Sequence, residues 1–168
     1  PKEMSPSMQR DNFEVALTDF EKHSIIKCLF KADNQRSTEC WSVQEIANFI
    51  ENCTEDQNIN LCILYWKDIH GNIYIIDGAH RLSSIYAWVK RYFADEQATQ
   101  APNFSDQQKE DIRDLRNHLG DLADFQKICI DPKFAEQTSK LDDIKISFRQ
   151  VLGTPDDARR VFQSLNSD

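Results

Sequence analysis

The sequence predicts an α/β (or α+β) fold, in which a single domain holds a small mixed sheet flanked by helices. Three short runs rich in β-branched and aromatic residues indicate strands at residues 61–66, 73–76 and 144–149. Apolar side chains at helical spacing indicate helices over residues 43–50 and 82–93. The chain has 168 residues, a length that fits one domain and can bury a core without disulfides or metals.

The N-terminal part is predicted to begin with a flexible arm. Residues 1–12 are polar, with two prolines and two methionines, and they precede a domain over residues 13–168. Residues 13–30 carry apolar positions at mixed spacing, which fits a strand or short helix followed by a helix. After a polar loop, Ser42 is a predicted N-cap, and Glu45 three residues later completes a capping box.

The middle of the chain has the pattern of a β-hairpin followed by a helix. The first two predicted strands flank a polar turn, whose centre is predicted at Gly71 and Asn72. The second strand ends in Asp77 and Gly78, and a helical pattern follows at once.

The C-terminal part is predicted to mix helices and short strands. Residues 105–125 have the spacing of a helix, and the Lys-Ile-Cys-Ile run at residues 127–130 is predicted as a short strand. Thr154 as N-cap and Pro155 at the first helical position introduce a last helix.

Charge and hydropathy limit the classes of function. The net charge is −8, whereas a DNA-binding surface must be basic to displace counterions, so direct DNA binding by this domain is doubtful. No run approaches the roughly 18 apolar residues of a membrane span, and no apolar segment follows the N-terminus. These features favour a cytoplasmic protein with no membrane contact.

The five cysteines are scattered and include no Cys-x-x-Cys pair, so a structural zinc site is not expected. They are Cys28, Cys40, Cys53, Cys62 and Cys129. A free cysteine is more often a small buried hydrophobe than a nucleophile, so none of the five is expected to be catalytic.

The junction at residues 77–81, Asp-Gly-Ala-His-Arg, carries the candidate chemistry. Gly78 permits a tight turn and a close approach of the backbone to a ligand. The first N–H groups of the next helix lack intrahelical partners and, with the helix dipole, favour an anion. Arg81 suits bidentate phosphate contact, His80 adds an imidazole, and Asp77 could hold Mg²⁺ or orient a water. These parts predict a phosphate site.

The same residues also fit a purely structural interpretation. An aspartate at a strand end is often an N-cap, and histidine or arginine often lies solvated in a first helical turn. Cations there oppose the helix dipole unless an anion offsets them, so the local chemistry leaves the two interpretations balanced. Trp66 and Tyr74 could line a base pocket, although a strand aromatic is more often core.

A family resemblance favours the functional interpretation. Residues 77–82, Asp-Gly-Ala-His-Arg-Leu, resemble the D-G-x-x-R-L signature of the ParB/sulfiredoxin-like superfamily. The closest likeness is to GmrSD-type restriction and phage-defence factors, whose motif is D-G-Q-Q-R-L. Gln35-Arg36 followed by Trp41, and residues 162–167 near the end, are similar to two flanking segments of that family.

The chain departs from the family pattern at Ala79 and His80, which replace the two glutamines. Related D-G-Q-H-R and D-G-H-H-R proteins share the histidine. Ala79 also stands where sulfiredoxin carries its reactive cysteine, so sulfinic-acid reduction is not expected. The family's HNH nuclease half is absent from these residues, and the chain is expected to be the N-terminal part of a longer protein or one partner of a split system.

The resemblance implies that the chain binds and hydrolyses a nucleoside triphosphate (NTP) with Mg²⁺, in DNA restriction or phage defence. The residues implied in catalysis are Asp77, His80 and Arg81, with Asp77 also as the metal ligand. The residues implied in nucleotide binding are Arg36, Gly78, Ala79 and Asn166. Two alternatives stay open: a non-catalytic nucleotide or modified-DNA sensor that regulates a partner nuclease domain or subunit, and a small-molecule kinase of the serine-kinase type.

Overall fold

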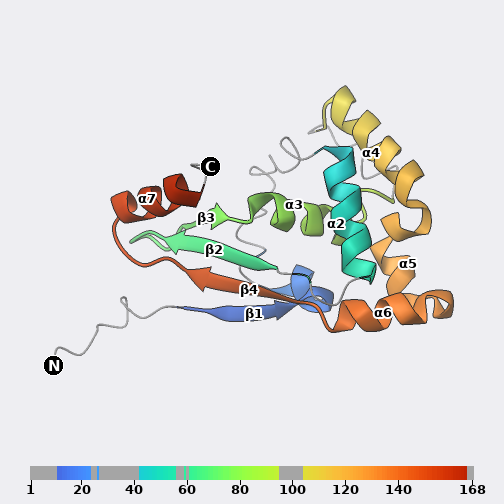
Figure 1. Ribbon diagram of the computed structural model, residues 1–168, viewed down its shortest axis with the longest axis horizontal. Coiled ribbons are helices and arrows are strands. Elements are labelled where there is room, and N and C mark those ends of the chain that lie inside the picture. The colour runs from blue at the N-terminus through green and yellow to red at the C-terminus, as the bar shows by residue number, and fades with distance from the viewer. Residues whose placement is uncertain are drawn as a thin grey trace.

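The computed structural model is a mixed α+β domain, and four strands form a mixed sheet within its described part (Figure 1). The described residues are 11–23, 26, 42–55, 59, 61–94 and 104–165. The strands are β1 (Phe13–Ala16), β2 (Cys62–Lys67), β3 (Ile73–Asp77) and β4 (Lys145–Gln150). The predicted fold class is therefore confirmed, whereas nearly all of the predicted arm, residues 1–10, lies outside the described residues.

The sheet has the strand order β1-β4-β2-β3. Its two central strands, β4 and β2, run parallel, with Ile63 opposite Phe148, and the two edge strands pair antiparallel to them. The β2–β3 hairpin turns over residues 68–72, where the Asp68 carboxylate accepts hydrogen bonds from the His70 and Asn72 amides at 2.9 and 2.8 Å. This side chain centres the turn at residues 69–70 rather than at the predicted Gly71-Asn72.

The helical elements gather mostly at one end of the sheet, while α7 lies apart from them and contacts β3 (Figure 1). They are η2 (Leu17–Lys22), α2 (Val43–Glu55), α3 (Ala79–Val89), α4 (Asp106–Leu119), η5 (Gly120–Ala123), α5 (Phe125–Ile130), η6 (Pro132–Phe134), α6 (Ala135–Asp142) and α7 (Pro155–Leu165). Among the described residues, no helix is long and apolar enough to cross a bilayer.

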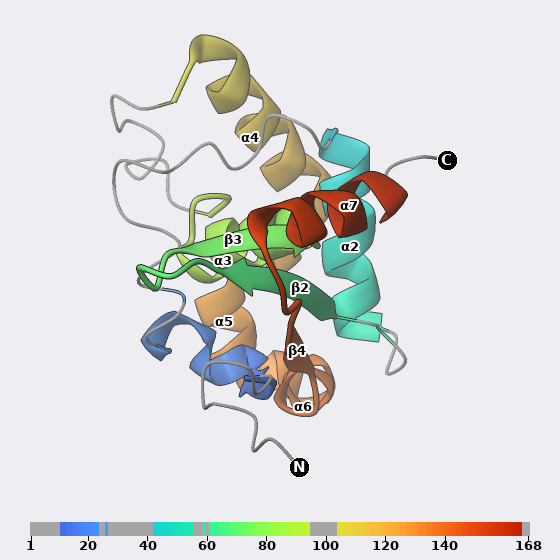
Figure 2. The same cartoon turned by 90° about the vertical axis from the view of Figure 1, so that its left-hand side faces the viewer.

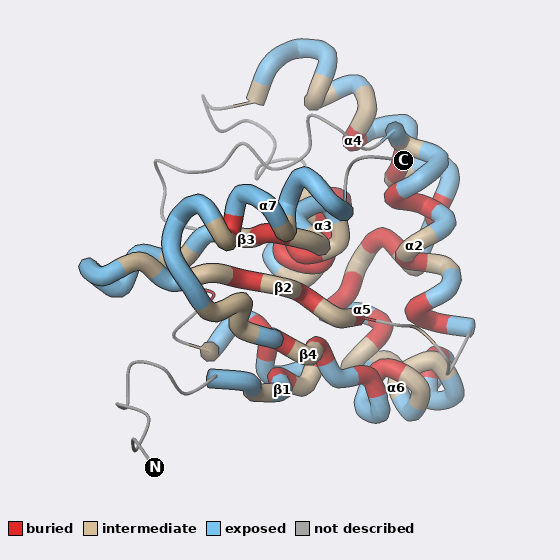
Figure 3. Tube along the Cα trace, turned by 60° about the vertical axis from the view of Figure 1, so that its left-hand side comes forward, coloured by how far each residue is buried: buried red, intermediate tan, exposed pale blue. Residues whose placement is uncertain are grey.

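The hydrophobic core lies between one face of the sheet and these helices, as the buried segments in Figure 3 indicate. Ile63 and Phe148 from the central strands and Trp88 from α3 are fully buried in it. The one polar atom of Trp88, Nε1, donates a hydrogen bond of 2.8 Å to the Leu122 carbonyl. Burial of Trp88 therefore leaves its polar atom with a hydrogen-bond partner, and this bond joins α3 to η5, which contains Leu122.

The predicted strand at residues 127–130 is wrong, because these residues form the second half of α5. The Asp124 carboxylate caps this helix by accepting a hydrogen bond from the Lys127 amide at 3.1 Å. An apolar run of four residues is too short for its spacing to distinguish a strand from a helix. The helix predicted over 105–125 is also interrupted, since Gly120 (φ +58°) ends α4.

Candidate functional site

The Asp-Gly-Ala-His-Arg segment lies where β3 turns directly into α3. Asp77 is the last residue of the strand, and Gly78 is the N-cap of the helix, with φ +96° and ψ +14°. The Gly78 carbonyl accepts the first helical hydrogen bond, from the Leu82 amide at 2.9 Å. The predicted strand–glycine–helix junction is confirmed, and α3 begins three residues earlier than its apolar spacing indicated.

Gly78 is required by the fold itself. Its φ of +96° lies in the left-handed region, which side-chain-bearing residues rarely adopt. A Cβ on Gly78 would also lie 2.5 Å from Ile63 Cδ1 and 3.3 Å from the Cys62 carbonyl oxygen, both on the neighbouring strand β2. The glycine therefore lets the turn pack tightly on the sheet, and its presence is explained without a ligand.

Asp77 and Arg81 meet across this turn. Arg81 Nη2 lies 3.5 Å from Asp77 Oδ2, and the two side chains are 26% and 46% exposed. The same Nη2 lies 3.4 Å from the position a Cβ on Gly78 would take, so the guanidinium is folded back over the turn. The structure thus brings three of the predicted site residues together at one half-exposed position.

The start of α3 also has an unusual charge pattern. No side chain caps it, and no acidic residue lies in its first turn, whereas His80 and Arg81 do. Ala79 and His80 are both exposed there. An uncapped helix start carries a partial positive charge, and the Arg81 guanidinium adds to it, so this spot favours an anion.

Two of the predicted site residues, Arg36 and Asn166, lie outside the described residues. Helix α7, the last described element before Asn166, lies beside β3 (Figures 1, 2 and 3) and contacts it. Strand β3 ends at Asp77.

The junction fits a magnesium ion only together with a bound ligand whose phosphate oxygens also coordinate the ion. Among the described residues, no group of three or more His, Cys, Asp or Glu side chains could hold a metal by itself. Magnesium, however, is typically held by one or two carboxylates together with substrate phosphates. Asp77 supplies one half-exposed carboxylate, which is compatible with that mode.

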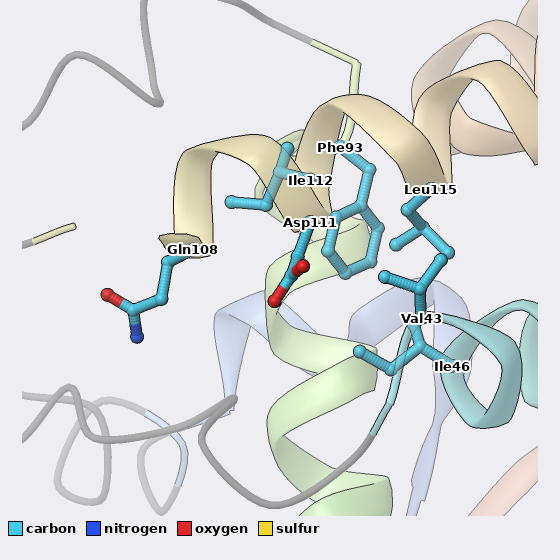
Figure 4. Close-up of a pocket in the computed structure, with 7 residues that line it drawn as sticks. All are labelled: Val43, Ile46, Phe93, Gln108, Asp111, Ile112 and Leu115. Atoms are coloured by element: carbon cyan, nitrogen blue, oxygen red, sulfur yellow. The ribbon is translucent and has the colours of Figure 1, made fainter. Parts of the chain in front are cut away.

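Two pockets lie away from the motif. One, between α2 and α4, is lined mainly by apolar side chains and has a volume of about 30 Å³, roughly the space of one water molecule (Figure 4). Its lining residues are Val43, Ile46, Phe93, Gln108, Asp111, Ile112 and Leu115. The other is an open hollow of about 300 Å³ at the α5–α6 junction, between Cys129 and Asp142. Sequence reasoning did not identify either pocket, because each combines residues from separate helical elements.

Trp66 and Tyr74, which were expected to be core, pack against each other near the surface. Their ring centroids lie 5.7 Å apart, but Tyr74 is 50% exposed and Trp66 is only half-buried. Trp66 Nε1 donates a 3.0 Å hydrogen bond to the Gly153 carbonyl, just before α7. Trp66 therefore fixes the entry to α7, and the expectation that this pair belongs to the core is wrong.

Two of the described cysteines, Cys53 and Cys129, have thiols with raised pKa values. Burial raises the pKa of Cys53 to about 12, and burial together with the Asp142 carboxylate raises the pKa of Cys129. A raised pKa disfavours the thiolate, which is the nucleophilic form. Cys28 and Cys40 lie outside the described residues.

Comparison with known protein families, with curated proteins and with solved structures finds no match for this chain. The site is therefore interpreted from its own geometry.

Proposed function

We propose that the chain binds a nucleoside triphosphate by its phosphates at the β3–α3 junction and hydrolyses it. The observation that carries this proposal is the arrangement around Gly78. There the Arg81 guanidinium lies over a tight strand-to-helix turn, beside an uncapped helix start. Oriented backbone amides and an arginine together favour a phosphate far more than either does alone.

Each residue of the junction has a role in this proposal. Arg81 binds phosphate oxygens through its fork of N–H donors, and the backbone from Gly78 to His80 lies against the same phosphate. His80, exposed in the first turn, adds a hydrogen bond or a positive charge to the transferring group. Asp77 would hold a magnesium ion, which would supply positive charge to neutralise that of the phosphates.

Hydrolysis consumes one water molecule. The water oxygen bonds to the terminal phosphorus as one water proton passes to the Asp77 carboxylate, the bond from that phosphorus to its bridging oxygen breaks, and a nucleoside diphosphate and inorganic phosphate leave. Asp77, the last residue of β3, orients the water by accepting its hydrogen bond and then returns the proton to solvent.

A sensing function without turnover is the second candidate, and the Asp77–Arg81 pair favours it. Only Asp77 supplies a carboxylate in the described part of the junction, and that carboxylate is already within ion-pair distance of Arg81. A site of this kind binds phosphate but activates water poorly. In either case the setting proposed from the resemblance is a cytoplasmic restriction or phage-defence system, in which the bound nucleotide controls a partner nuclease.

Thermal unfolding with a panel of NTPs and NDPs, with and without Mg²⁺, tests the proposal. A ligand present at 100 times its Kd stabilises the folded state by about 2.7 kcal/mol, which is easily measured. Arg81→Ala should abolish the shift. Arg160→Ala is the matched control, because Arg160 is an exposed arginine paired with Asp157 at 2.9 Å on α7. Release of inorganic phosphate from the same samples separates hydrolysis from sensing, and a full shift with Arg81→Ala would refute the proposed site.

A further inference from the structure

The Trp66–Tyr74 pair lies on the face of the sheet that is turned away from the core. Tyr65, the neighbour of Trp66 in β2, is buried in the core, so Trp66 and its cross-strand partner Tyr74 lie on the opposite face. The hydrogen bond from Trp66 to the Gly153 carbonyl holds the indole ring in place. Tyr74 packs against that ring and keeps half of its own surface exposed. The pair therefore offers a flat aromatic surface to a ligand.

A register shift in the β2–β3 hairpin places Asp77 on the same face as Tyr74. The two residues are three positions apart in β3, and in a regular strand they would face opposite sides of the sheet. The pairing shifts by one residue, so that Leu64 lies opposite Asp77. Trp66, two residues further along β2 and on the same face as Leu64, lies opposite Tyr74. Bulges that redirect a side chain in this way are common beside active sites.

The distance from the aromatic pair to the β3–α3 junction matches the length of one nucleotide. A strand rises about 3.3 Å per residue, so Tyr74 lies about 10 Å along β3 from Asp77. An extended nucleoside triphosphate separates its base from its terminal phosphate by a comparable length. Helix α7 also contacts β3 and borders the same stretch (Figures 1 and 2). A nucleotide whose phosphates lie at Gly78 can therefore bring its base to Tyr74.

We infer that Tyr74, held in place by Trp66, stacks on the base of the nucleotide whose phosphates occupy the β3–α3 junction. This inference rests on the proposed nucleotide site, but the exposed aromatic pair and the register shift carry it independently of the Asp77–Arg81 pair. Stacking recognises the flat face that every base presents, so the site tolerates different bases. Purines, which have the larger ring system, should bind more tightly than pyrimidines.

Isothermal titration calorimetry with ATP and with inorganic tripolyphosphate, both in excess Mg²⁺, tests the inference. Tripolyphosphate has the phosphate chain without a base, so only the binding of ATP should depend on Tyr74. Tyr74→Ala should weaken ATP binding by about 5- to 150-fold, the range that stacking of one base on an aromatic ring provides, and leave tripolyphosphate binding unchanged. Tyr74→Phe keeps the ring and should retain most of the affinity. Ile69→Ala is the control, because Ile69 is an exposed apolar residue in the turn of the same hairpin.

The outcomes separate the inference from the function on which it rests. If Tyr74→Ala binds ATP as tightly as the wild type, or loses affinity for ATP and tripolyphosphate alike, the inference is overturned while the phosphate site stands. If the wild type binds neither ligand, both are overturned. Should Tyr74→Ala fail to fold, the ring signals of Tyr74 in the wild type decide the matter by NMR. They should move with ATP and stay in place with tripolyphosphate, and equal movement contradicts the inference.

Discussion

Helices α3 and α7 begin in opposite ways, although both follow a strand through a glycine-containing turn. At the start of α7, the Asp157 carboxylate accepts hydrogen bonds from the Thr154 amide and hydroxyl, at 2.9 and 3.0 Å. The Thr154 hydroxyl in turn accepts one from the Asp157 amide at 3.2 Å. The start of α3 has Gly78 as N-cap, no capping side chain and two basic residues in its first turn.

At the start of α7, side chains of the protein hydrogen-bond the first N–H groups of the helix. At the start of α3, no side chain does so. Side-chain caps also begin α2, α4 and α5, whereas α6, like α3, begins without one. Helix α6 has the acidic Glu136 in its first turn, and α3 has no acidic residue there. Asp77, directly before Gly78, already pairs with Arg81. In the proposed function, the start of α3 is completed by an external anion, whereas the start of α7 is satisfied by its own side chains.

The largest effect is expected for Gly78→Ala. The substitution forces a side chain into the left-handed region and brings its Cβ to 2.5 Å from Ile63 Cδ1, so it should lower the free energy of unfolding by about 2–4 kcal/mol. Gly71→Ala is the matched control. Gly71 has a similar φ of +83° but no atom within 4 Å of its Cβ position, so a loss of only about 1 kcal/mol is expected. Equal losses in urea unfolding would contradict the packing argument.

A smaller loss is expected when the cap of α7 is removed. Thr154→Ala deletes the hydroxyl that accepts from the Asp157 amide, and such caps contribute about 1 kcal/mol. Thermal unfolding followed by circular dichroism measures the change. Thr138→Ala provides a comparison inside α6, where the hydroxyl donates to the carbonyls of Phe134 and Ile128 rather than accepting from a free amide. A Thr154→Ala variant as stable as the wild type would show that α7 does not depend on its cap.

Acid should weaken the start of α7 selectively. The pKa of the Asp157 carboxyl lies below its ordinary value, because the Thr154 amide and hydroxyl donate to it and Arg160 lies nearby. A lowered pKa in the folded state gives stability that is present above the unfolded pKa of about 3.9 and is lost as the pH falls through the folded pKa. Hydrogen exchange at pH 6 and pH 3 should therefore show Asp157→Asn abolishing the acid-induced opening of α7. An opening that persists in this variant would assign it to another carboxylate.

The smallest change in stability is expected for Ala79→Glu, which should raise the free energy of unfolding rather than lower it. A carboxylate in the first turn of α3 complements the helix dipole and should stabilise the fold by about 0.5 kcal/mol. The same charge should weaken nucleotide binding several-fold, because it occupies the place of the anion. A control Glu at Lys109, in the first half of α4, tests whether added negative charge alone weakens binding. A variant that gains stability and keeps its nucleotide affinity would contradict the account of α3.

Features that depend on residues close together in the sequence could be predicted, whereas features that depend on distant segments could not. The caps at Ser42 and Thr154, and the glycine turn at residue 78, were predictable because each depends on residues only a few positions apart. The pairing of β2 with β4 in parallel was not, since it joins segments separated by more than 80 residues. The contact of Gly78 with Ile63 depends on that same sheet register. The role of Asn166 beside the motif was expected from the family resemblance alone and stays a prediction, because Asn166 lies outside the described residues.

Backbone amide NMR during a titration with Mg-ATP tests the central claim most directly. The two helix starts serve as site and internal reference in one spectrum, so no substitution is needed. The largest shifts should fall on the amides of residues 78–82, while those of residues 156–158 should move little. Shifts that centre on the start of α7, or that are absent from residues 78–82 at saturating nucleotide, would contradict it.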